Sequence, residues 1–232
     1  MAYAAQVLGV KALVVMPEDA SPYKKACARA YGAEVVDRGV TAENREEVAR
    51  ALQEETGYAL IHPFDDPLVI AGQGTAGLEL LAQAGRMGVF PEAVLAPVGG
   101  GGLLAGLATA VKALSPTTLL LGVEPEVADD ARRSLEAGRL FRLEAPPRTR
   151  ADGVRTLSLG EHTFPILKKK ADGILVVSEE AILEAERLLF TRTKQVVEPT
   201  VALPLAAVLE HGARLPQTLA LLLSGGNRDF SP

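Results

Sequence analysis

Four consecutive glycines are the residues whose type and spacing point most directly to chemistry. They are Gly99, Gly100, Gly101 and Gly102, called the glycine loop below. The apolar run at residues 93–98 predicts a buried strand before them, and residues 103–114 predict a helix after them. Successive backbone N–H groups at such a turn, with the positive end of the helix, can hold a phosphate without a cationic side chain. The sequence therefore predicts an anion site here, with a flexible loop as the alternative.

A second glycine-rich turn, residues 224–227, follows an apolar run at residues 219–223. If the two preceding strands are parallel, both turns lie at one edge of the sheet, where ligand crevices form in open α/β folds. Predicted strands alternate with predicted helices along the chain, which indicates an α/β fold with open, mostly parallel sheets and flanking helices. These strands are expected at residues 12–16, 33–36, 58–62, 93–98, 119–123, 173–177 and 219–223.

The segment His-Pro-Phe-Asp-Asp-Pro at residues 62–67 interrupts this alternation. Two prolines and two aspartates do not continue a strand, and Asp66 followed by Pro67 can begin a helix. We place a domain boundary here. It gives a smaller domain at residues 1–66 and a larger domain at residues 67–232, which contains both glycine turns.

Two strings match the dinucleotide-binding pattern G-x-G-x-x-G/A. In residues 72–77 no strand ending in an acid follows at the required distance, so we interpret these glycines as allowing close helix packing. The second string is Gly100-x-Gly102-x-x-Ala105, and Glu124 ends the next strand about where a ribose-binding acid belongs. A nicotinamide-dependent oxidoreductase is therefore an alternative function.

Four acids cluster just after the strand predicted at residues 119–123. They are Glu124, Glu126, Asp129 and Asp130. An oxygen-rich cluster of this kind suits a hard divalent cation better than a single ribose hydroxyl. The alternative is a solvated acidic helix start, since acids are favourable at a helix N-terminus.

Composition narrows the class of protein. The 232 residues carry a net charge of -5 and no basic run longer than the three lysines at 168–170, which argues against a nucleic-acid surface. One cysteine, Cys27, and three histidines provide neither a disulfide framework nor an ordinary zinc site. No stretch has the length of a membrane span and no leader pattern opens the sequence. We expect a cytoplasmic protein with no nucleic-acid or membrane partner.

Short motifs that follow one another along the whole chain resemble those of one enzyme family. They are VMPE at 15–18, AYGAEV at 30–35, HP at 62–63, IAGQGT at 70–75, PVGGGGL at 97–103, VEP at 123–125, ADGV at 151–154, FPI at 164–166, VEP at 197–199 and LSGGN at 223–227. In this combination the chain resembles the pyridoxal-phosphate (PLP) enzymes of the threonine/serine dehydratase and serine racemase family. The resemblance implies the two-domain tryptophan synthase beta-like fold, known as fold type II.

The resemblance also implies roles for particular residues. The cofactor phosphate would be held by backbone N–H groups of Gly99, Gly100, Gly101, Gly102 and Leu103. Ser224 would hydrogen-bond the pyridine nitrogen, Glu198 would lie near the ring, and Gly153 would contact it through its backbone. A site for Mg²⁺ or Ca²⁺ would consist of Glu124, the carbonyl of Ala128 and Asp130.

Ser224 bears on the reaction that the resemblance implies. A serine hydroxyl does not keep the ring nitrogen protonated, so β-elimination is favoured over transamination. The implied enzyme is a threonine/serine ammonia-lyase, a homodimer that converts L-threonine or L-serine to a 2-oxo acid and ammonia. The sequence does not separate threonine from serine, or dehydration from racemisation.

The Schiff-base lysine of the family is not among the eight lysines of this chain. The family carries it in an N-terminal Ser-Phe-Lys-like motif, followed by a Ser-Gly-Asn-His loop, and this sequence has neither. Residues 1–9 have the pattern of the middle or end of a helix that stops at Gly9, with no capping residue before it, so we expect an N-terminally truncated chain. That lysine is also the base that removes the α-proton, so we expect the chain to be inactive as given. The alternatives are a dehydratase with a misplaced start and a non-catalytic PLP- or phosphate-binding fragment.

Overall fold

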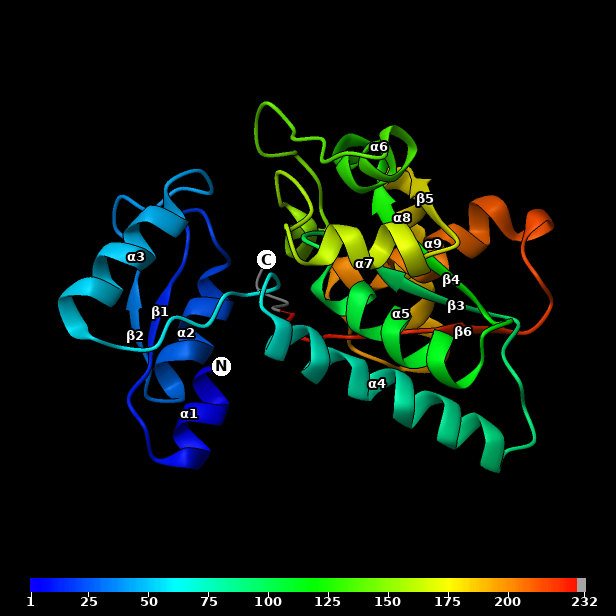
Figure 1. Cartoon of the computed structure of the whole chain (residues 1–232), viewed down its shortest axis with the longest axis horizontal. Coiled ribbons are helices and arrows are strands. Elements are labelled where there is room, and N and C mark those ends of the chain that lie inside the picture. Colours follow the sequence, from blue (N-terminus) through cyan, green and yellow to red (C-terminus); the bar gives the residue numbers. More distant parts are fainter. Residues whose placement is uncertain (229–232) are drawn as a thin grey trace. The chain divides into compact units, whose positions relative to one another are not determined.

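The structure, a computed structural model, describes residues 1–228 of the chain. Two units are distinguished by their internal contacts (Figure 1). The small unit comprises Met1–Ile61 with Asn227 and Arg228, and the large unit comprises His62–Gly226. Residues 62–66, which we expected in the smaller domain, thus belong to the large unit.

The small unit is a two-stranded parallel sheet with helices. Strand β1 (Leu13–Val15) pairs with β2 (Glu34–Val36), and the helices are α1 (Ala2–Leu8), α2 (Pro22–Ala30) and α3 (Arg45–Thr56). Helix α2 begins at Pro22, because Ser21 accepts the N–H of Lys24 and proline is favoured at the first helical position. The strand expected at residues 58–62 was wrong. These residues pair with no strand in the described chain, and apolar character alone cannot supply a partner.

The large unit contains a parallel four-stranded sheet in the order β5-β4-β3-β6. Its strands are β3 (Ala93–Pro97), β4 (Leu119–Pro125), β5 (Gly173–Val177) and β6 (Leu219–Leu221). Leu95 is paired with Leu121 on one side and with Leu221 on the other. The predicted parallel sheet is therefore confirmed, and β3 and β6 end at the same edge.

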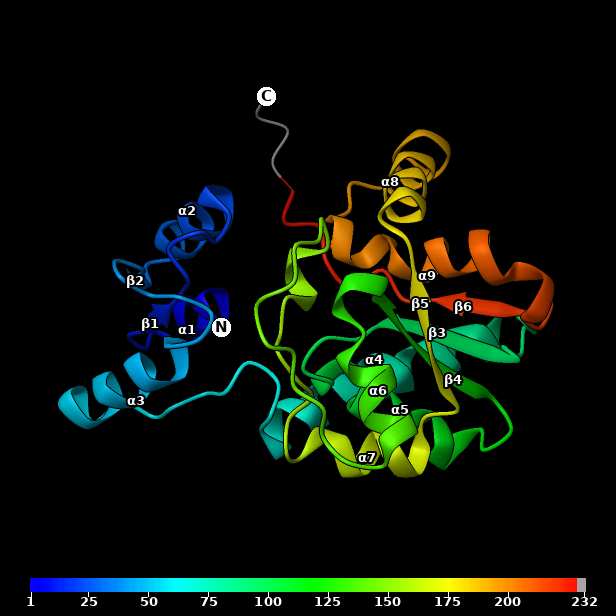
Figure 2. The same ribbon diagram turned by 90° about the horizontal axis from the view of Figure 1, so that it is seen from above.

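Helices cover both faces of this sheet (Figure 2). On one face, Val94, Ala96 and Leu120 pack into a core with helices α4 (Pro67–Arg86), α5 (Gly102–Leu114) and α7 (Thr163–Lys170). On the other face, Leu95 and Val123 pack with α8 (Glu179–Leu188) and α9 (Pro199–His211). Alternate residues of β3 thus enter opposite cores, which explains why this strand is apolar throughout.

Glycines bring α4 and α5 into close contact. A Cβ atom on Gly74 would lie 3.0 Å from the carbonyl oxygen of Gly106, and one on Gly77 would lie 3.2 Å from the Cβ of Ala110. A Cβ on Gly106 would overlap the carbonyl oxygen of Ile70. Residues 72–77 lie inside α4 rather than in a strand-to-helix turn, so the helix-packing interpretation is confirmed.

The remaining elements are short. Turns of 3-10 helix lie at Glu126–Ala128 (η1), Asp152–Val154 (η2) and Gly212–Arg214 (η4), and a π-helical turn lies at Leu189–Thr193 (η3). Helix α6 (Asp130–Ala137) follows η1, and Asp129 separates the two. Helix α9 begins at Pro199, where proline occupies the first helical position.

Candidate cofactor and cation sites

The glycine loop connects β3 to α5 at the carboxyl edge of the sheet. Gly101 is the N-cap of α5, and its backbone φ angle of 91° is one that residues with a side chain rarely adopt. Within residues 1–228, no group accepts a hydrogen bond from the N–H of Gly99, Gly100, Gly101, Gly102 or Leu103. Five successive donors at a helix start, without acceptors in the protein, are a donor set that fits a phosphate.

The protein packs closely around this loop. A Cβ on Gly99 would lie 3.0 Å from the Cα of Val154, and one on Gly102 would lie 2.7 Å from the carbonyl oxygen of Phe64. A Cβ on Gly100 would overlap the Phe64 ring. The sequence led us to attribute the glycines to close approach of an anion. The structure adds a second reason, which is that protein atoms occupy the space of the missing side chains.

Ser224 and Glu198 are brought together at the same sheet edge. The β6 strand lies beside β3, and the chain leaves it toward Ser224, whose side chain is exposed. The N–H of Glu198 donates to the carbonyl oxygen of Gly225 over 3.3 Å, and a Cβ on Gly225 would overlap the Glu198 carboxylate. The predicted pair of ring-contacting residues therefore lies in one cluster.

Gly153 lies in η2, which packs against the start of α9. Its N–H donates to the Oγ1 atom of Thr200 over 2.8 Å. The same turn carries Val154, the neighbour of Gly99 described above. Gly153 is thus connected to the glycine loop through its neighbour, and only its carbonyl oxygen is left to contact a ligand through the backbone. Thr200 was not recognised from the sequence, since a lone threonine after a Glu-Pro pair carries no distinctive pattern.

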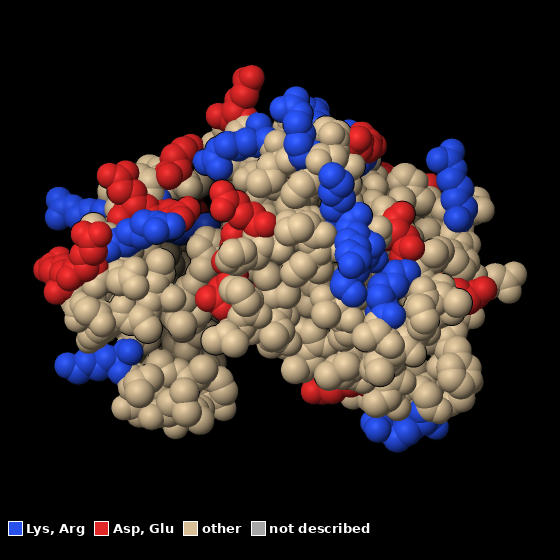
Figure 3. Space-filling view, viewed as in Figure 1, with Lys and Arg blue, Asp and Glu red and all other residues tan. Residues whose placement is uncertain are grey.

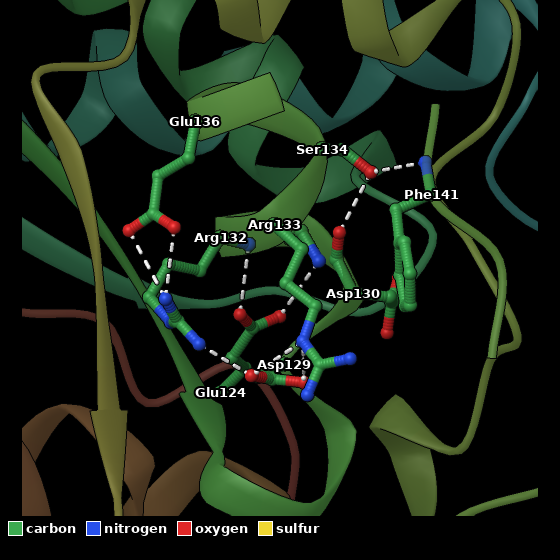
Figure 4. Close-up of polar contacts among 9 residues, drawn as sticks. Glu124, Asp129, Asp130, Arg132, Arg133, Ser134, Glu136 and Phe141 are labelled. Carbon is green, nitrogen blue, oxygen red and sulfur yellow. Dashed lines mark hydrogen bonds and ion pairs between the residues drawn. The ribbon is translucent and has the colours of Figure 1, made fainter. Parts of the chain in front are cut away.

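Glu124 and Asp130 lie buried between β4 and α6 (Figure 4). The Glu124 carboxyl group accepts the N–H of Ala131 over 3.1 Å and the N–H of Arg132 over 2.9 Å. Burial raises the pKa of Glu124 to about 9, and the nearby charge of Asp130 acts in the same direction. Burial likewise raises the pKa of Asp130 to about 7, with a further contribution from Asp129.

The other two acids of this cluster are placed differently. Asp129 is paired with the guanidinium groups of Arg132 and Arg133, and Glu126 is exposed. Asp130 Oδ2 is buried and has no hydrogen-bond partner among the described residues. The solvated helix start considered above therefore describes Glu126 but not Glu124 or Asp130.

A buried carboxylate without a cationic partner must bind a proton or another cation. Ala128, which lies between Glu124 and Asp130 in the chain, is also buried and can offer its carbonyl oxygen. Together these three residues provide the kind of oxygen ligands that bind a divalent cation. No group of three His, Cys, Asp or Glu residues in the described chain could hold a metal. Such an ion would therefore depend on two carboxylates, main-chain oxygen and water.

The charge distribution of the surface and the apolar character of the helices also bear on the sequence-based expectations. On the face drawn in Figure 3, basic and acidic side chains lie side by side. Among residues 1–228, no helix combines the length and the apolar character needed to cross a membrane.

Known proteins are similar to this chain in sequence over nearly its whole length. A family model described as pyridoxal-phosphate dependent enzyme matches residues 1–225. The L-threo-3-hydroxyaspartate ammonia-lyase of Saccharomyces cerevisiae is 42% identical over 231 residues, which cover 99% of this chain and 69% of the yeast protein. Human serine racemase is 41% identical over 235 residues, which cover 100% of this chain and 68% of the human protein.

Solved structures are similar over the same extent. The crystal structure of a threonine deaminase from T.th. superposes with a TM-score of 0.96 at 93% identity, covering 100% of this chain and 74% of that one. Maize serine racemase superposes with a TM-score of 0.91 at 36% identity, covering 99% of this chain and 70% of that one. The expected tryptophan synthase beta-like fold is thus confirmed. The chain belongs to the family of pyridoxal-phosphate-dependent enzymes that includes ammonia-lyases and racemases of hydroxy-amino acids.

Proposed function

We propose that these 232 residues form the cofactor-phosphate-binding part of a threonine/serine ammonia-lyase. The observation that carries this proposal is the row of N–H groups from Gly99 to Leu103, which has no acceptor in the described protein and lies at the sheet edge that Ser224 shares. The likeness to a threonine deaminase and to an ammonia-lyase supports L-threonine or L-serine as substrate, with serine racemisation as the alternative reaction.

The residues of the large unit would divide the work of binding PLP. The N–H groups of the glycine loop and Leu103, with the N-terminal end of α5, would hold the phosphate. Ser224 would hydrogen-bond the pyridine nitrogen without charging it. Glu198 and Gly153 would border the ring, Glu198 from beside the turn that carries Ser224. When bound, PLP supplies an electron sink for a carbanion at the substrate Cα, and an uncharged ring nitrogen favours loss of a β-hydroxyl.

We also propose that Glu124, the Ala128 carbonyl and Asp130 bind Mg²⁺ or Ca²⁺. The ion would replace the protons that these two carboxyl groups otherwise retain. It would join the end of β4 to the start of α6, two elements of the large unit that the Glu124 hydrogen bonds described above already connect. Its role would therefore be structural.

None of the eight lysines would serve as the Schiff-base lysine or remove the α-proton. In the large unit, Lys112 lies in the last turn of α5, at the opposite end of that helix from the glycine loop. Its Nζ atom lies 2.6 Å from the carboxylate of Asp172. Lys168, Lys169 and Lys170 occupy the last turn of α7, and Lys194 donates to the carbonyl oxygen of Thr191. We propose that turnover requires a lysine outside these residues, and that the chain binds PLP without reacting.

A nicotinamide-dependent oxidoreductase is the competing hypothesis. It would need the Glu124 carboxylate to reach the ribose hydroxyl of a large cofactor, but this side chain is buried against the start of α6. We also propose that the protein is cytoplasmic, as its single cysteine indicates, and that it forms a homodimer, as the likeness to the family implies.

Binding of an unreactive cofactor analogue tests the proposal. Pyridoxine 5′-phosphate lacks the aldehyde and so cannot label surface lysines. We expect it to bind one site per chain by isothermal titration calorimetry, with competition by inorganic phosphate, while NADH does not bind. A folded chain that ignores pyridoxine 5′-phosphate, or that binds NADH instead, would refute the proposal.

A further inference from the structure

The carbonyl oxygen of Gly100 points away from the helix that its own loop begins. It accepts the hydroxyl of Thr163 over 2.7 Å and the N–H of Gly160 over 3.1 Å. Thr163 is the first residue of α7 and is fully buried. Its hydroxyl lies 3.3 Å from the carbonyl oxygen of Gly160, so the shorter and better bond is the one to Gly100.

Asp65 fixes the position of Thr163 from a distant part of the chain. Its carboxylate accepts the N–H groups of Glu161 and His162, each over 2.9 Å, and that of Thr163 over 3.2 Å. Asp65 therefore accepts the main-chain N–H groups at the start of α7, although it precedes them by 96 to 98 positions in the sequence. Asp65 thus holds α7 in place, and α7 carries the hydroxyl that binds the glycine loop.

Peptide geometry extends this contact to the other side of the loop. The peptide between Gly100 and Gly101 is trans, so the Gly100 carbonyl and the Gly101 N–H point in opposite directions. Holding that carbonyl against α7 turns the Gly101 N–H away from α7. Neither residue has a side chain that would limit rotation of this peptide, so its orientation depends on the hydrogen bonds that Thr163 and Gly160 donate to the carbonyl.

We propose that Thr163 is a positioning residue for the phosphate site: it orients the Gly100–Gly101 peptide so that the Gly101 N–H points at the bound phosphate. Thr163 does not itself touch the ligand in this role. The inference rests on the proposed function, because it requires that the glycine loop binds the cofactor phosphate.

Two variants of the full chain separate this role from packing. Thr163→Val keeps the volume and removes the hydroxyl, and Thr163→Ser keeps the hydroxyl and removes a methyl group. We expect Thr163→Val to bind pyridoxine 5′-phosphate and inorganic phosphate about tenfold more weakly than the wild type, as loss of the buried hydrogen bond to Gly100 predicts. The hydroxyl also accepts the N–H of Gly160 over 2.9 Å, but in the variant that N–H still has the Gly100 carbonyl oxygen as its acceptor. Thr163→Ser should bind both within about twofold of the wild type. Pyridoxine, which has no phosphate, should bind equally to all three proteins.

The outcomes are distinct. Equal losses for pyridoxine and its phosphate in Thr163→Val, or unchanged affinity for both, would overturn the role of Thr163 and leave the proposed function standing. Failure of the wild type to bind either phosphate compound would refute the proposed function itself. If Thr163→Val does not fold, the wild type decides the question by ¹H–¹⁵N NMR. Addition of phosphate should move the Gly101 amide proton downfield, and an unmoved Gly101 signal in a saturated protein would overturn the inference.

Discussion

Raising the pH in the absence of divalent cations should destabilise this protein through Glu124. The pKa of this carboxyl group is raised from 4.5 to about 9, mainly by burial. Between these two values the folded chain binds one more proton than the unfolded chain, so the free energy of unfolding falls as the pH rises. The stabilising effect of the proton is complete below pH 4.5 and disappears as the pH passes through about 9.

The size of the effect follows from the width of this window. Each pH unit within it changes the free energy of unfolding by about 1.4 kcal/mol, so the step from about pH 6 to about pH 8 should cost about 3 kcal/mol. Asp130 acts in the same direction up to its own raised pKa of about 7. A cation that replaces these protons should oppose the loss, and should therefore stabilise the protein more at about pH 8 than at about pH 6.

Urea unfolding followed by circular dichroism measures the effect, with EDTA in one series and excess CaCl₂ in another. Glu124→Gln is the matched control, because it keeps the shape of the side chain and cannot ionise. This variant should be less stable at about pH 6 by about 1 kcal/mol, since its amide group cannot accept both main-chain N–H groups. It should also lose the pH dependence and the response to calcium. A wild-type stability in EDTA that is flat or rises over the same pH range would refute this explanation.

Three other experiments test the packing, the capping and the proposal that this chain has no Schiff-base lysine. Gly106→Ala places a Cβ against the main chain of α4 and should destabilise the protein by about 3 kcal/mol in urea unfolding, whereas Gly85→Ala, with open space around it, should stabilise it by up to about 1 kcal/mol. Equal effects would contradict the close helix contact. Asp65→Ala removes the cap of α7 and should cost about 1–2 kcal/mol in the same assay; an unchanged stability would show that the cap contributes nothing. Borohydride reduction after incubation with PLP should yield no stoichiometric pyridoxyl-lysine in peptide mass spectrometry, and one fully labelled lysine would show that this chain holds its own reactive residue.

Much of the fold was predictable because its determinants are local. Ser21 with Pro22, and Asp66 with Pro67, mark helix starts by capping chemistry that is readable from adjacent residues. Apolar runs such as residues 93–97 predict strands buried on both faces. The strand expected at residues 58–62 failed for the complementary reason. Its formation depends on a pairing partner elsewhere in the chain, which no local pattern reports.

The candidate sites divide in the same way. The glycine loop, the acids that begin at Glu124 and the turn at Ser224 could be located because each directly follows an apolar run that predicts a strand. Their environment could not be predicted, since the contacts that define it join distant residues. Asp65 reaches α7 across 96 to 98 positions, and Gly153 is bound by Thr200 across 47 positions. Glu124 is buried and Glu126 is exposed, and this difference likewise depends on tertiary packing that the sequence pattern does not report.

The glycine loop is constrained from two sides, and this affects how its function can be tested. On one side, protein atoms of Phe64, Thr163 and Val154 fill the positions that side chains would take. On the other, main-chain N–H groups are free of acceptors in the described chain. Substituting a loop glycine would therefore disturb folding and anion binding together, and a loss of binding would not identify its cause. The Thr163 hydroxyl separates the two, because it can be removed at nearly constant volume and acts on the loop through a single hydrogen bond.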